Sequence, residues 1–376
     1  MGRFDRSDTE RNACRLNGKL AYKGYDWWWH SFTGKSRESG KEKSFFIEYF
    51  LCNPALGSEE PVLGQDPENL ENEFWPSYLM IKAGCWGENA RQIHRFFGCE
   101  EVSVYGRKSF RIVAGDCRAS ETMISGSVSM TWEDAAEHPE YMSQTGEMSW
   151  KLNVDKKIPF NVGYGAGKLM RDLNAFEMYW HAEGMKTLYN GEVILDGEIY
   201  DVKPDTCYGY ADKNWGSNFT TPWIWLSSND IVRKRDNRRM RNSAFDIGGG
   251  RPRVFGIGLN RILLGALYLE GKPIEFNFSK PWTCPRTRFK CKETEKEIIW
   301  HVEQENRDYV MQVNIHCNRK DMLLINYEAP DGSRPHKRLW NGGNGTGWIK
   351  LYRKVRGERL YLEEYRIGHA GCEYGE

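Results

Sequence analysis

The sequence predicts an all-β protein made of antiparallel β-barrels with few short helices. Short segments with strand alternation recur at regular spacing along the chain, separated by turn residues, and few segments show a helical period. Aromatic residues (15 Trp, 19 Tyr and 17 Phe) make up 14% of the 376 residues. In a β-rich chain, this content indicates a wide interior that the rings either fill or line.

The overall charge and the cysteines argue against several classes of protein. The formal net charge is +1, so no overall field recruits nucleic acid or a membrane surface. No run reaches the roughly 18 apolar residues of a membrane span, and the first residues lack the apolar core of a signal peptide. The ten cysteines form no Cys-x-x-Cys pair and no Cys/His cluster with zinc spacing. We expect a cytoplasmic protein with free thiols, without metal, nucleic-acid partner or integral membrane contact.

In the first half, residues 1–19 are polar and predict a loose lead-in. The acidic segment between Pro54 and Trp75 is long for a connection and predicts a lid or a crossing segment. Residues 132–139 predict one or two helical turns that Pro139 ends, and residues 174–180 fit either a helix or a strand. Strands are expected at residues 22–32, 44–52, 78–83, 103–105, 109–114, 122–132 and 147–154.

In the second half, the Asp196-Gly197 pair predicts a hairpin over residues 193–200, because it suits a turn with positive φ. Strands are expected at residues 222–229, 288–295, 297–302 and 309–317, and a further hairpin turns at Pro330-Asp331-Gly332. A weak echo between residues 24–27 and 209–215 supports two equivalent halves, each group on the first strand of a barrel. We place the boundary near residue 200, giving a lead-in at 1–19, one barrel at 20–200 and a second at 201–376.

The chemistry is concentrated in the octet Gly209-Tyr210-Ala211-Asp212-Lys213-Asn214-Trp215-Gly216, which is followed by a Trp-rich segment. In a strand, Asp212 and Asn214 point to one face while Lys213 and Trp215 point to the other. A surface strand does not need this mixture of side chains, and a core does not tolerate it unpaired. The octet is therefore predicted to open the second half and to carry the site.

The octet resembles the acid-Lys-Asn-Trp-Gly string of the tocopherol cyclase family, which also precedes a Trp-rich strand. The resemblance covers roughly residues 20–376 and is strongest over 177–280. It implies two tandem lipocalin-like barrels, a fold similar to that of the carotenoid hydratases. The chain departs from the family at residues 24–29, where the family shows a Gly-Trp-Tyr-Phe-like string. The other matching strings are Glu177-Met178-Tyr179-Trp180-His181, Gly184-Met185, Leu195-Asp196-Gly197, Gly248-Gly249-Gly250, residues 265–272 and Leu339-Trp340-Asn341-Gly342-Gly343.

Three residues are candidates for catalysis. Asp212 either faces a cavity, oriented by Asn214, or forms a salt bridge at a domain interface. Asp26 lies beside three tryptophans, so poor solvation would raise its pKa, unless it is a solvated strand residue. His181 either shuttles a proton or is structural. The candidates for binding substrate are Tyr25, Trp27, Trp29, His30, Lys213, Asn214, Trp215, Trp223 and Trp225.

Two further patterns have simpler interpretations. Residues 233–241 hold six basic residues, and without interleaved aromatics for base stacking they predict a solvated hairpin loop, with an anionic contact as the alternative. The glycine clusters at 248–250, 256–258 and 342–347 lack the residues of phosphate-binding and dinucleotide-binding loops. They predict β-turns or corner bends.

The resemblance implies a cofactor-independent enzyme in which a buried acid protonates a C=C bond of a prenylated or isoprenoid substrate. Tryptophan faces would stabilise the tertiary carbocation, and an internal hydroxyl (ring closure) or water (hydration) would capture it. The alternative is a carrier that holds a hydrophobic small molecule without chemical change. In a third possibility, a scaffold, the aromatics pack against each other and leave no cavity. The substrate and the oligomeric state stay open.

Overall fold

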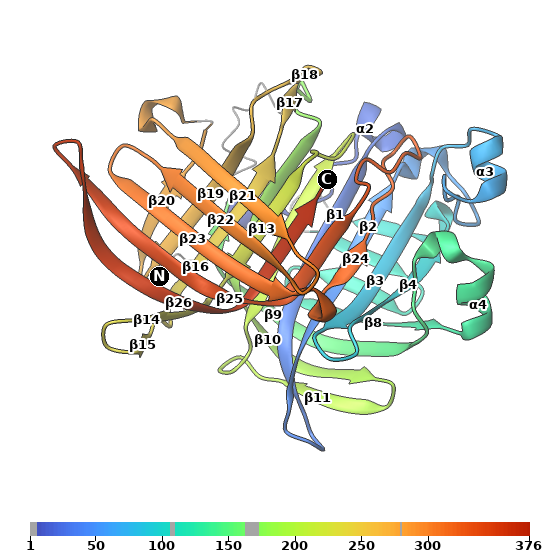
Figure 1. The fold of residues 1–376 in the computed structure, drawn as a ribbon. Coiled ribbons are helices and arrows are strands. Elements are labelled where there is room, and N and C mark those ends of the chain that lie inside the picture. The colour runs from blue at the N-terminus through green and yellow to red at the C-terminus, as the bar shows by residue number, and fades with distance from the viewer. Residues whose placement is uncertain (1–5, 106–109, 162–172, 279) are drawn as a thin grey trace.

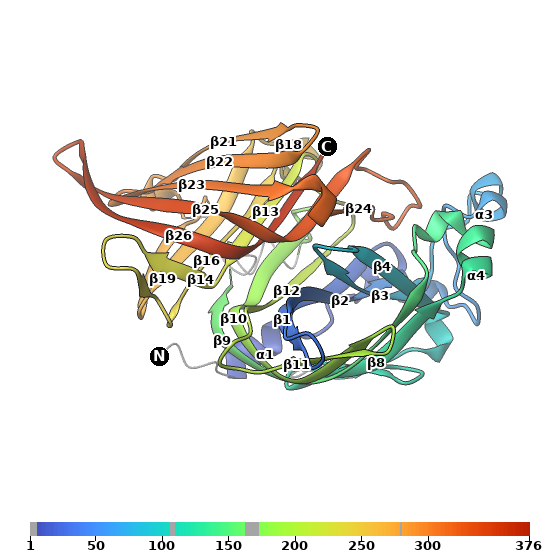
Figure 2. The same ribbon diagram turned by 60° about the horizontal axis from the view of Figure 1, so that its bottom comes forward.

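The computed structural model describes residues 6–105, 110–161, 173–278 and 280–376. The described chain forms two large antiparallel sheets, each curled into a barrel. The two barrels lie side by side (Figure 1), and a second view shows the blue-to-green barrel below the yellow-to-red one (Figure 2). The predicted all-β class, with two tandem lipocalin-like barrels and few short helices, is confirmed.

The first sheet is formed by the strands of residues 25–216. β11 and β12 lie end to end between β1 and β10, because β1 pairs with β12 through residues 25–31 and with β11 through residues 35–36. The sheet runs β4-β3-β2-β1-β11-β10-β9-β8-β7-β6-β5 and curls until β4 lies against β8. Its strands are β1 (Tyr25–Ser36), β2 (Glu42–Cys52), β3 (Tyr78–Trp86), β4 (Arg91–Phe97), β5 (Ser103–Tyr105), β6 (Arg111–Ala114), β7 (Cys117–Ser120), β8 (Met123–Met130), β9 (Gly146–Phe160), β10 (Met178–Leu195), β11 (Glu198–Val202) and β12 (Gly209–Gly216).

The second sheet runs β20-β19-β16-β13-β26-β25-β23-β22-β21, with β14, β15 and β24 attached beside this path. β17 and β18 form a separate ribbon. The strands are β13 (Trp223–Ser228), β14 (Asp230–Arg233), β15 (Arg238–Arg239), β16 (Ser243–Gly250), β17 (Arg253–Val254), β18 (Ile257–Gly258), β19 (Ile262–Leu269), β20 (Lys272–Phe276), β21 (Arg286–Glu293), β22 (Glu297–Glu305), β23 (Tyr309–Asn318), β24 (Leu323–Ile325), β25 (Leu339–Val355) and β26 (Glu358–Gly375).

The helices are short and lie outside the sheets. α4 begins after Thr131, whose Oγ1 accepts a hydrogen bond from the backbone of Asp134, and ends before Pro139, as predicted. The α-helices are α1 (Arg6–Arg11), α2 (Lys19–Tyr22), α3 (Pro67–Glu71) and α4 (Trp132–Glu137), and the 3₁₀ helices are η1 (Pro54–Leu56), η2 (Cys99–Glu101), η3 (Pro139–Tyr141), η5 (Pro281–Thr283) and η6 (Arg319–Asp321). Among the described residues, no helix has the length and apolarity needed to cross a membrane.

Most of the expected strands are present. The Asp196-Gly197 hairpin is confirmed, with φ of 48° and 82° at its two turn residues, and β22 pairs with β23 as predicted. The ambiguous segment at 174–180 leads into strand β10. The hairpin expected to turn at residues 330–332 is confirmed with a longer connection, because Pro330 and Asp331 turn the chain between β24 and β25, which pair antiparallel. All ten cysteines are free thiols, and residues 233–239 form the exposed hairpin of β14 and β15.

Two expectations about organisation need correction. β12, the octet strand, pairs with β1 and β10, so it completes the first sheet instead of opening the second half. The change of sheet therefore comes between Gly216 and Trp223, later than the expected boundary near residue 200. The lead-in is not loose at residues 12–15, because Asn12 is 1% exposed and its side chain reaches His181 inside the first barrel.

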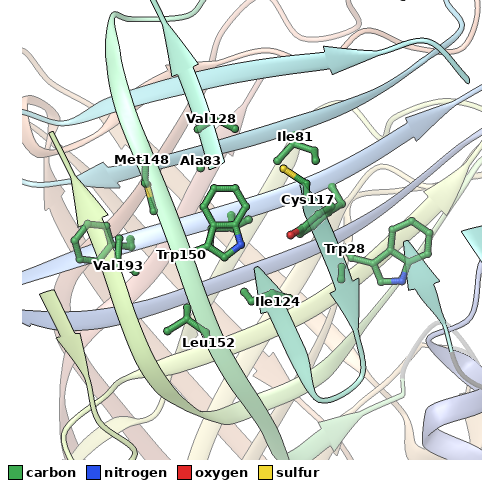
Figure 3. Close-up of a cluster of buried hydrophobic side chains, with 14 of the residues drawn as sticks. Trp28, Ile81, Ala83, Cys117, Ile124, Val128, Met148, Trp150, Leu152 and Val193 are labelled. Carbon is green, nitrogen blue, oxygen red and sulfur yellow. The ribbon is translucent and has the colours of Figure 1, made fainter. Parts of the chain in front are cut away.

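Each barrel has its own hydrophobic cluster, and a further cluster lies between the barrels. The first interior contains Trp28 and Trp150 packed with residues such as Ile81, Ile124 and Leu152 (Figure 3). The second interior contains residues of β13, β16, β22, β23 and β26. The cluster between them takes the outward faces of β1, β3, β10 and β12 and the facing residues of β13, β16 and β25. β12 is buried at every position for this reason, whereas the central part of β9 alternates between buried and exposed residues.

The glycine clusters lie inside strands and make room for tryptophans. Gly248 is in β16, and a Cβ there would lie 3.2 Å from the ring of Trp180 in the other barrel. Gly343 is in β25, and a Cβ there would overlap the ring of Trp86 in β3. Of the two expectations for these glycines, β-turns are therefore wrong at 248–250 and 342–347, whereas a bend fits β25, whose pairing register with β26 shifts between Gly342 and Gly347. The glycines let large rings of the first barrel approach the backbone of the second.

Gly343→Ala is expected to destabilise the fold by about 1–3 kcal/mol, because the new methyl group must displace a ring that is tied on its other side. The Trp86 indole donates to Asn341 Oδ1 over 2.7 Å, so it cannot simply turn away. Urea unfolding measures the loss. Gly258→Ala is the control, since no atom lies within 4 Å of a Cβ at that position. Equal stability of the two variants would contradict the close packing at Trp86.

Candidate functional site

The alternation of β1 separates two polar regions. Tyr25, Trp27 and Trp29 belong to the cluster between the barrels, whereas Trp28 belongs to the interior of the first barrel. β12 lies antiparallel beside β1 with Asp212 opposite Trp29 and Asn214 opposite Trp27. Directly opposite residues share a face, so Asp212 and Asn214 face the second barrel. The predicted division of the octet between two faces is confirmed.

Asp212 lies at the centre of the interface and is held by aromatic donors. Its Oδ2 accepts hydrogen bonds from Trp180 Nε1 (2.9 Å) and Tyr210 OH (3.1 Å), and its Oδ1 accepts from Trp27 Nε1 at 3.4 Å. The residue is 6% exposed. Burial raises the pKa of Asp212 to about 8, against these hydrogen bonds, and the nearby charge of Glu373 adds to the increase. Asp212 is therefore mainly a neutral acid at pH 7.

Tyr210 connects Asp212 to a second buried acid, Asp246 of β16. The Tyr210 hydroxyl lies 3.1 Å from Asp212 Oδ2 and 2.9 Å from Asp246 Oδ2. A phenol has one hydrogen to donate, so the second of these contacts needs a proton carried by a carboxyl group. Burial, followed by repulsion from Asp212, raises the pKa of Asp246 well above its usual range. The three groups can thus share a proton across the two barrels.

A third acid of the interface is Glu373 of β26. Its carboxyl oxygens accept from Trp223 Nε1 (2.7 Å) and Asn341 Nδ2 (2.6 Å). Burial raises the pKa of Glu373 to about 7, and the bonds from Trp223 and Asn341 oppose the increase. Trp223 and Trp225 are therefore both hydrogen-bonded to buried acids, since Trp225 Nε1 lies 3.2 Å from Asp246 Oδ1.

A buried cation stands near these acids. Lys82 Nζ is 2.6 Å from Glu48 Oε2, and both side chains are at most 1% exposed. The ammonium lies 4.4 Å from the ring centre of Tyr327 and 5.9 Å from that of Trp29. The Nε1 of Trp29 has no hydrogen-bond partner among the described residues, which leaves one indole donor available at the level of Asp212.

The other catalytic candidates lie on the opposite face of the strands. Asp26 forms a fully buried ion pair with Lys213, and its Oδ2 also accepts from the backbone N of Arg15 over 2.6 Å. His181 contacts Asn12 Oδ1 over 2.9 Å, and burial lowers its pKa well below the usual range. The structure therefore does not bring Asp26 or His181 to Asp212.

The remaining binding candidates divide in the same way. Tyr25 faces the interface and donates to Asn214 Oδ1 over 2.8 Å, while the amide nitrogen of Asn214 has no partner among the described residues. Trp215 stacks on Tyr179 at 5.2 Å, away from the interface. His30 contacts Tyr189 OH over 2.8 Å, and burial lowers its pKa well below the usual range. Tyr25, Trp27, Trp29, Asn214, Trp223 and Trp225 thus share the interface between the barrels with Asp212, whereas Lys213, Trp215 and His30 do not.

Several residues of the interface were not singled out from the sequence. Asp246 carried a signal, because it is an acid between Phe245 and Ile247 in a buried strand, two residues before the glycine cluster. Glu48 and Lys82 carried the same signal, each as a charge inside an apolar strand. Glu373 had no local signal, since it lies near the chain end between polar and small residues.

At the rim of the interface, His369 joins the two barrels. Its Nδ1 lies 2.7 Å from Asp230 Oδ2 in the second barrel, and its Nε2 lies 2.6 Å from Glu42 Oε1 in the first. Its ring stacks on Tyr208 at 4.0 Å, and Arg239 lies 3.6 Å from Asp230. Burial opposes the positive charge, but the hydrogen bonds to Asp230 and Glu42 outweigh it and raise the pKa of His369 to about 9.

The protein is expected to lose stability between about pH 6.5 and pH 9 through His369. A raised folded pKa gives stability that is complete below the unfolded value and is lost as the pH rises through the folded value. The side chain is 28% exposed, so we expect a change of about 1–3 kcal/mol. Urea unfolding at pH 6.5 and 9.5 should show that the free energy of unfolding decreases less in His369→Gln than in the wild type. The control is His301→Gln, on the exposed side of β22; equal pH dependence in both variants would contradict the role of His369.

Comparison with known proteins assigns the family. The model of the tocopherol cyclase-like family matches residues 50–375. A protein of Nitrosomonas europaea assigned as an AttH is 11% identical over 95% of this chain and 97% of that one, with a TM-score of 0.42. Kievitone hydratase of Nectria haematococca is 10% identical over 96% and 94% of the two chains, with a TM-score of 0.45. The search of curated sequences found no significant match. Because the family model matches most of the length of this chain, the chain belongs to the tocopherol cyclase-like family.

Proposed function

We propose that this protein is a cofactor-independent enzyme that protonates the C=C bond of a prenylated phenol. Asp212 is the acid. The observation that carries the proposal is a buried carboxyl group with a pKa of about 8, fixed by two indoles and a phenol. A neutral carboxylic acid in an apolar site is the proton donor that an unactivated alkene requires.

The aromatic rings beside Asp212 suit a carbocation. The centres of Trp27 and Tyr327 are 4.8 Å apart, and Phe219 lies 6.0 Å from Trp27. Ring faces attract a nearby cation by roughly 2 kcal/mol when water is excluded. Transfer of the Asp212 proton to the less substituted carbon of a prenyl group leaves a tertiary cation among these rings, while the carboxylate that remains balances its charge.

A narrow pocket lies at one end of the interface. Its free volume is about 30 Å³, and its apolar wall includes Phe50, Tyr78, Met80 and Tyr327, so these side chains must move apart to admit a phenol ring. Gln92 Oε1, His94 Nδ1 and Asn326 Oδ1 line the same pocket or lie beside it, and they have no hydrogen-bond partner among the described residues. Buried polar atoms without partners are uncommon, and here they would bind the phenolic hydroxyl.

The segment between Pro54 and Trp75 helps to close this pocket, which is the role expected for a crossing segment. Leu63 lines the pocket, and Gln65 Nε2 donates to the backbone oxygen of Gly332 in the second half of the chain. Before the segment, Asn53 Nδ2 donates to Pro330 O over 2.8 Å. The chain before and within this segment is thus joined by hydrogen bonds to residues 330–332 of the second half.

The experiment uses 2-prenylphenol in D₂O. We expect one deuterium from solvent at the carbon next to the tertiary centre of the product, detected by mass spectrometry and ¹³C NMR. The rate should be highest at low pH and fall as the pH rises through about 8, because Asp212 must carry a proton to act. A carrier would bind the probe, quench tryptophan fluorescence and leave it unlabelled. Binding without deuterium uptake at any pH would overturn the proposal in favour of the carrier.

A further inference from the structure

A second pocket reaches the acids from the end of the interface opposite to the phenol pocket. The phenol pocket is at the level of Phe50 and Met80, whereas the second is at the level of Ser44 and Trp86 on the same two strands. Asp212 lies between these levels, because its partner Trp29 pairs with Glu48. The second pocket has a free volume of about 20 Å³, enough for one water molecule, and is lined by Tyr210, the residue that joins the two aspartates.

The lining of the second pocket is rich in hydroxyl groups. Its hydroxyl-bearing residues include Ser31, Thr33, Ser44, Ser227 and Ser228. Thr33, Ser44 and Ser228 are hydrogen-bonded to other parts of the protein.

Two of these hydroxyls stand beside the acids and are unused. Ser31 lies directly opposite Tyr210 in the pairing of β1 with β12, and Ser227 lies opposite Asp246 in the pairing of β13 with β16. Opposite residues share a face, so each serine is next to a member of the proton-sharing group. They are 9% and 3% exposed, and neither Oγ has a hydrogen-bond partner within the described part of the chain.

The second pocket is adjacent to an outer one that is more polar and larger. The two have Ser44, Trp86 and His369 in common, and the outer pocket has a free volume of about 430 Å³ between charged residues of the rim. The shared residues connect the rim to Tyr210. A molecule as small as water can therefore be supplied from the rim while the phenol pocket is occupied from the other end.

We propose that Ser31 and Ser227 hold the water molecule that captures the carbocation, so that the product is a tertiary alcohol and not a closed ring. This rests on the proposed function. The proton of Asp212 goes to the alkene carbon, the water oxygen bonds to the tertiary carbon, and the oxonium group loses a proton. Tyr210 passes that proton to Asp246 or back to Asp212, which restores the acid. The sum is alkene plus water to alcohol, with no oxidant or cofactor.

The test compares isosteric variants at both serines in the full chain. Ser227→Thr keeps the hydroxyl, and Ser227→Val has the shape of threonine without the hydroxyl. Ser31→Thr and Ser31→Val form the second pair. In H₂¹⁸O with 2-prenylphenol, we expect ¹⁸O in the tertiary alcohol. The ratio of alcohol to 2,2-dimethylchroman should be about threefold to tenfold lower for each Val variant than for its Thr partner. A crystal structure should contain an ordered water bonded to Ser31 and Ser227.

The outcomes separate the two proposals. Chroman as the main product of the wild type, or equal ratios in the Thr and Val variants, would overturn the water site while leaving Asp212 as the acid. If no variant takes up deuterium, the proposed function fails. The crystal structure alone then decides whether the water site exists. An ordered water on both serines would then support the water site, and a dry pocket would refute it. Thermal unfolding confirms that each variant is folded.

Discussion

Asp212→Asn is expected to lower turnover of 2-prenylphenol by about 100- to 10,000-fold, the range that general acid catalysis contributes. Asparagine has nearly the same shape, and its oxygen can still accept from Trp180 and Tyr210. It has no proton acidic enough for an alkene. Because Asp212 is already mainly neutral at pH 7, the substitution changes little charge, and binding of the probe, followed by tryptophan fluorescence, should be retained.

The stability of this variant provides an independent check on the pKa of Asp212. The folded pKa of about 8 is above the usual aspartate pKa of 3.8, so the wild type loses stability as the pH rises between these two values. Asp212→Asn should remove that part of the decrease. Urea unfolding from pH 4 to pH 8.5 measures it. Parallel curves for the two proteins would mean that Asp212 is ionised in the folded state and is not the acid.

Tyr210→Phe distinguishes a shared proton from an isolated acid. The phenylalanine cannot join Asp212 to Asp246, and it removes an acceptor of the Trp225 indole. Turnover should fall less than in Asp212→Asn, since the acid itself remains, but its pH dependence should shift as the two carboxyl groups uncouple. Retained turnover in Asp212→Asn would contradict the assignment and point to Asp246 or Glu373.

The face to which Asp212 points could be predicted from the sequence because strand alternation is a local property. It depends only on the two-residue period of β12, and the register of β1 and β12 then brings Trp27 and Trp29 to the same face. The choice of the sheet that β12 joins does not depend on its local sequence. Every residue of the octet is buried, so alternation of polar and apolar residues could not indicate which sheet would pair with it.

The acids opposite Asp212 could not be derived from local patterns. Asp246 and Glu373 come to the interface from β16 and β26, and their approach depends on how the two barrels dock. The glycine clusters misled for the same reason. In the sequence alone, Gly248 and Gly343 resemble turn residues. These positions require glycine because the rings of Trp180 and Trp86 across the interface leave no space for a side chain.

Asp26 illustrates the limit of reasoning about burial alone. The expectation of poor solvation holds, since burial raises its pKa and the attraction of Lys213 opposes the increase. The paired strand nevertheless supplies a cation from the diagonal position, since Lys213 lies opposite Trp28 with its Nζ 3.8 Å from the ring centre of that residue. A buried carboxyl group with such a partner is suited to hold strands together.

Lys213→Met is therefore expected to cost about 3–5 kcal/mol of folding stability, because it leaves Asp26 buried without a counter-charge. Both members of the pair are fully buried, and Asp26 also fixes the backbone of Arg15 in the N-terminal segment. The double variant Asp26→Asn/Lys213→Met should recover most of the loss, since asparagine still accepts from Arg15 and needs no cation. Urea unfolding of the two single variants and the double variant measures the coupling between the residues.

Activity separates this structural role from a catalytic one. Folded Asp26→Asn/Lys213→Met should retain the deuterium uptake of the wild type, because the pair faces the interior of the first barrel while Asp212 faces the second. Loss of uptake in a stable double variant would restore Asp26 as a candidate acid. A double variant no more stable than Lys213→Met alone would mean that the lysine acts mainly through its packing on Trp28, and not through the charge of Asp26.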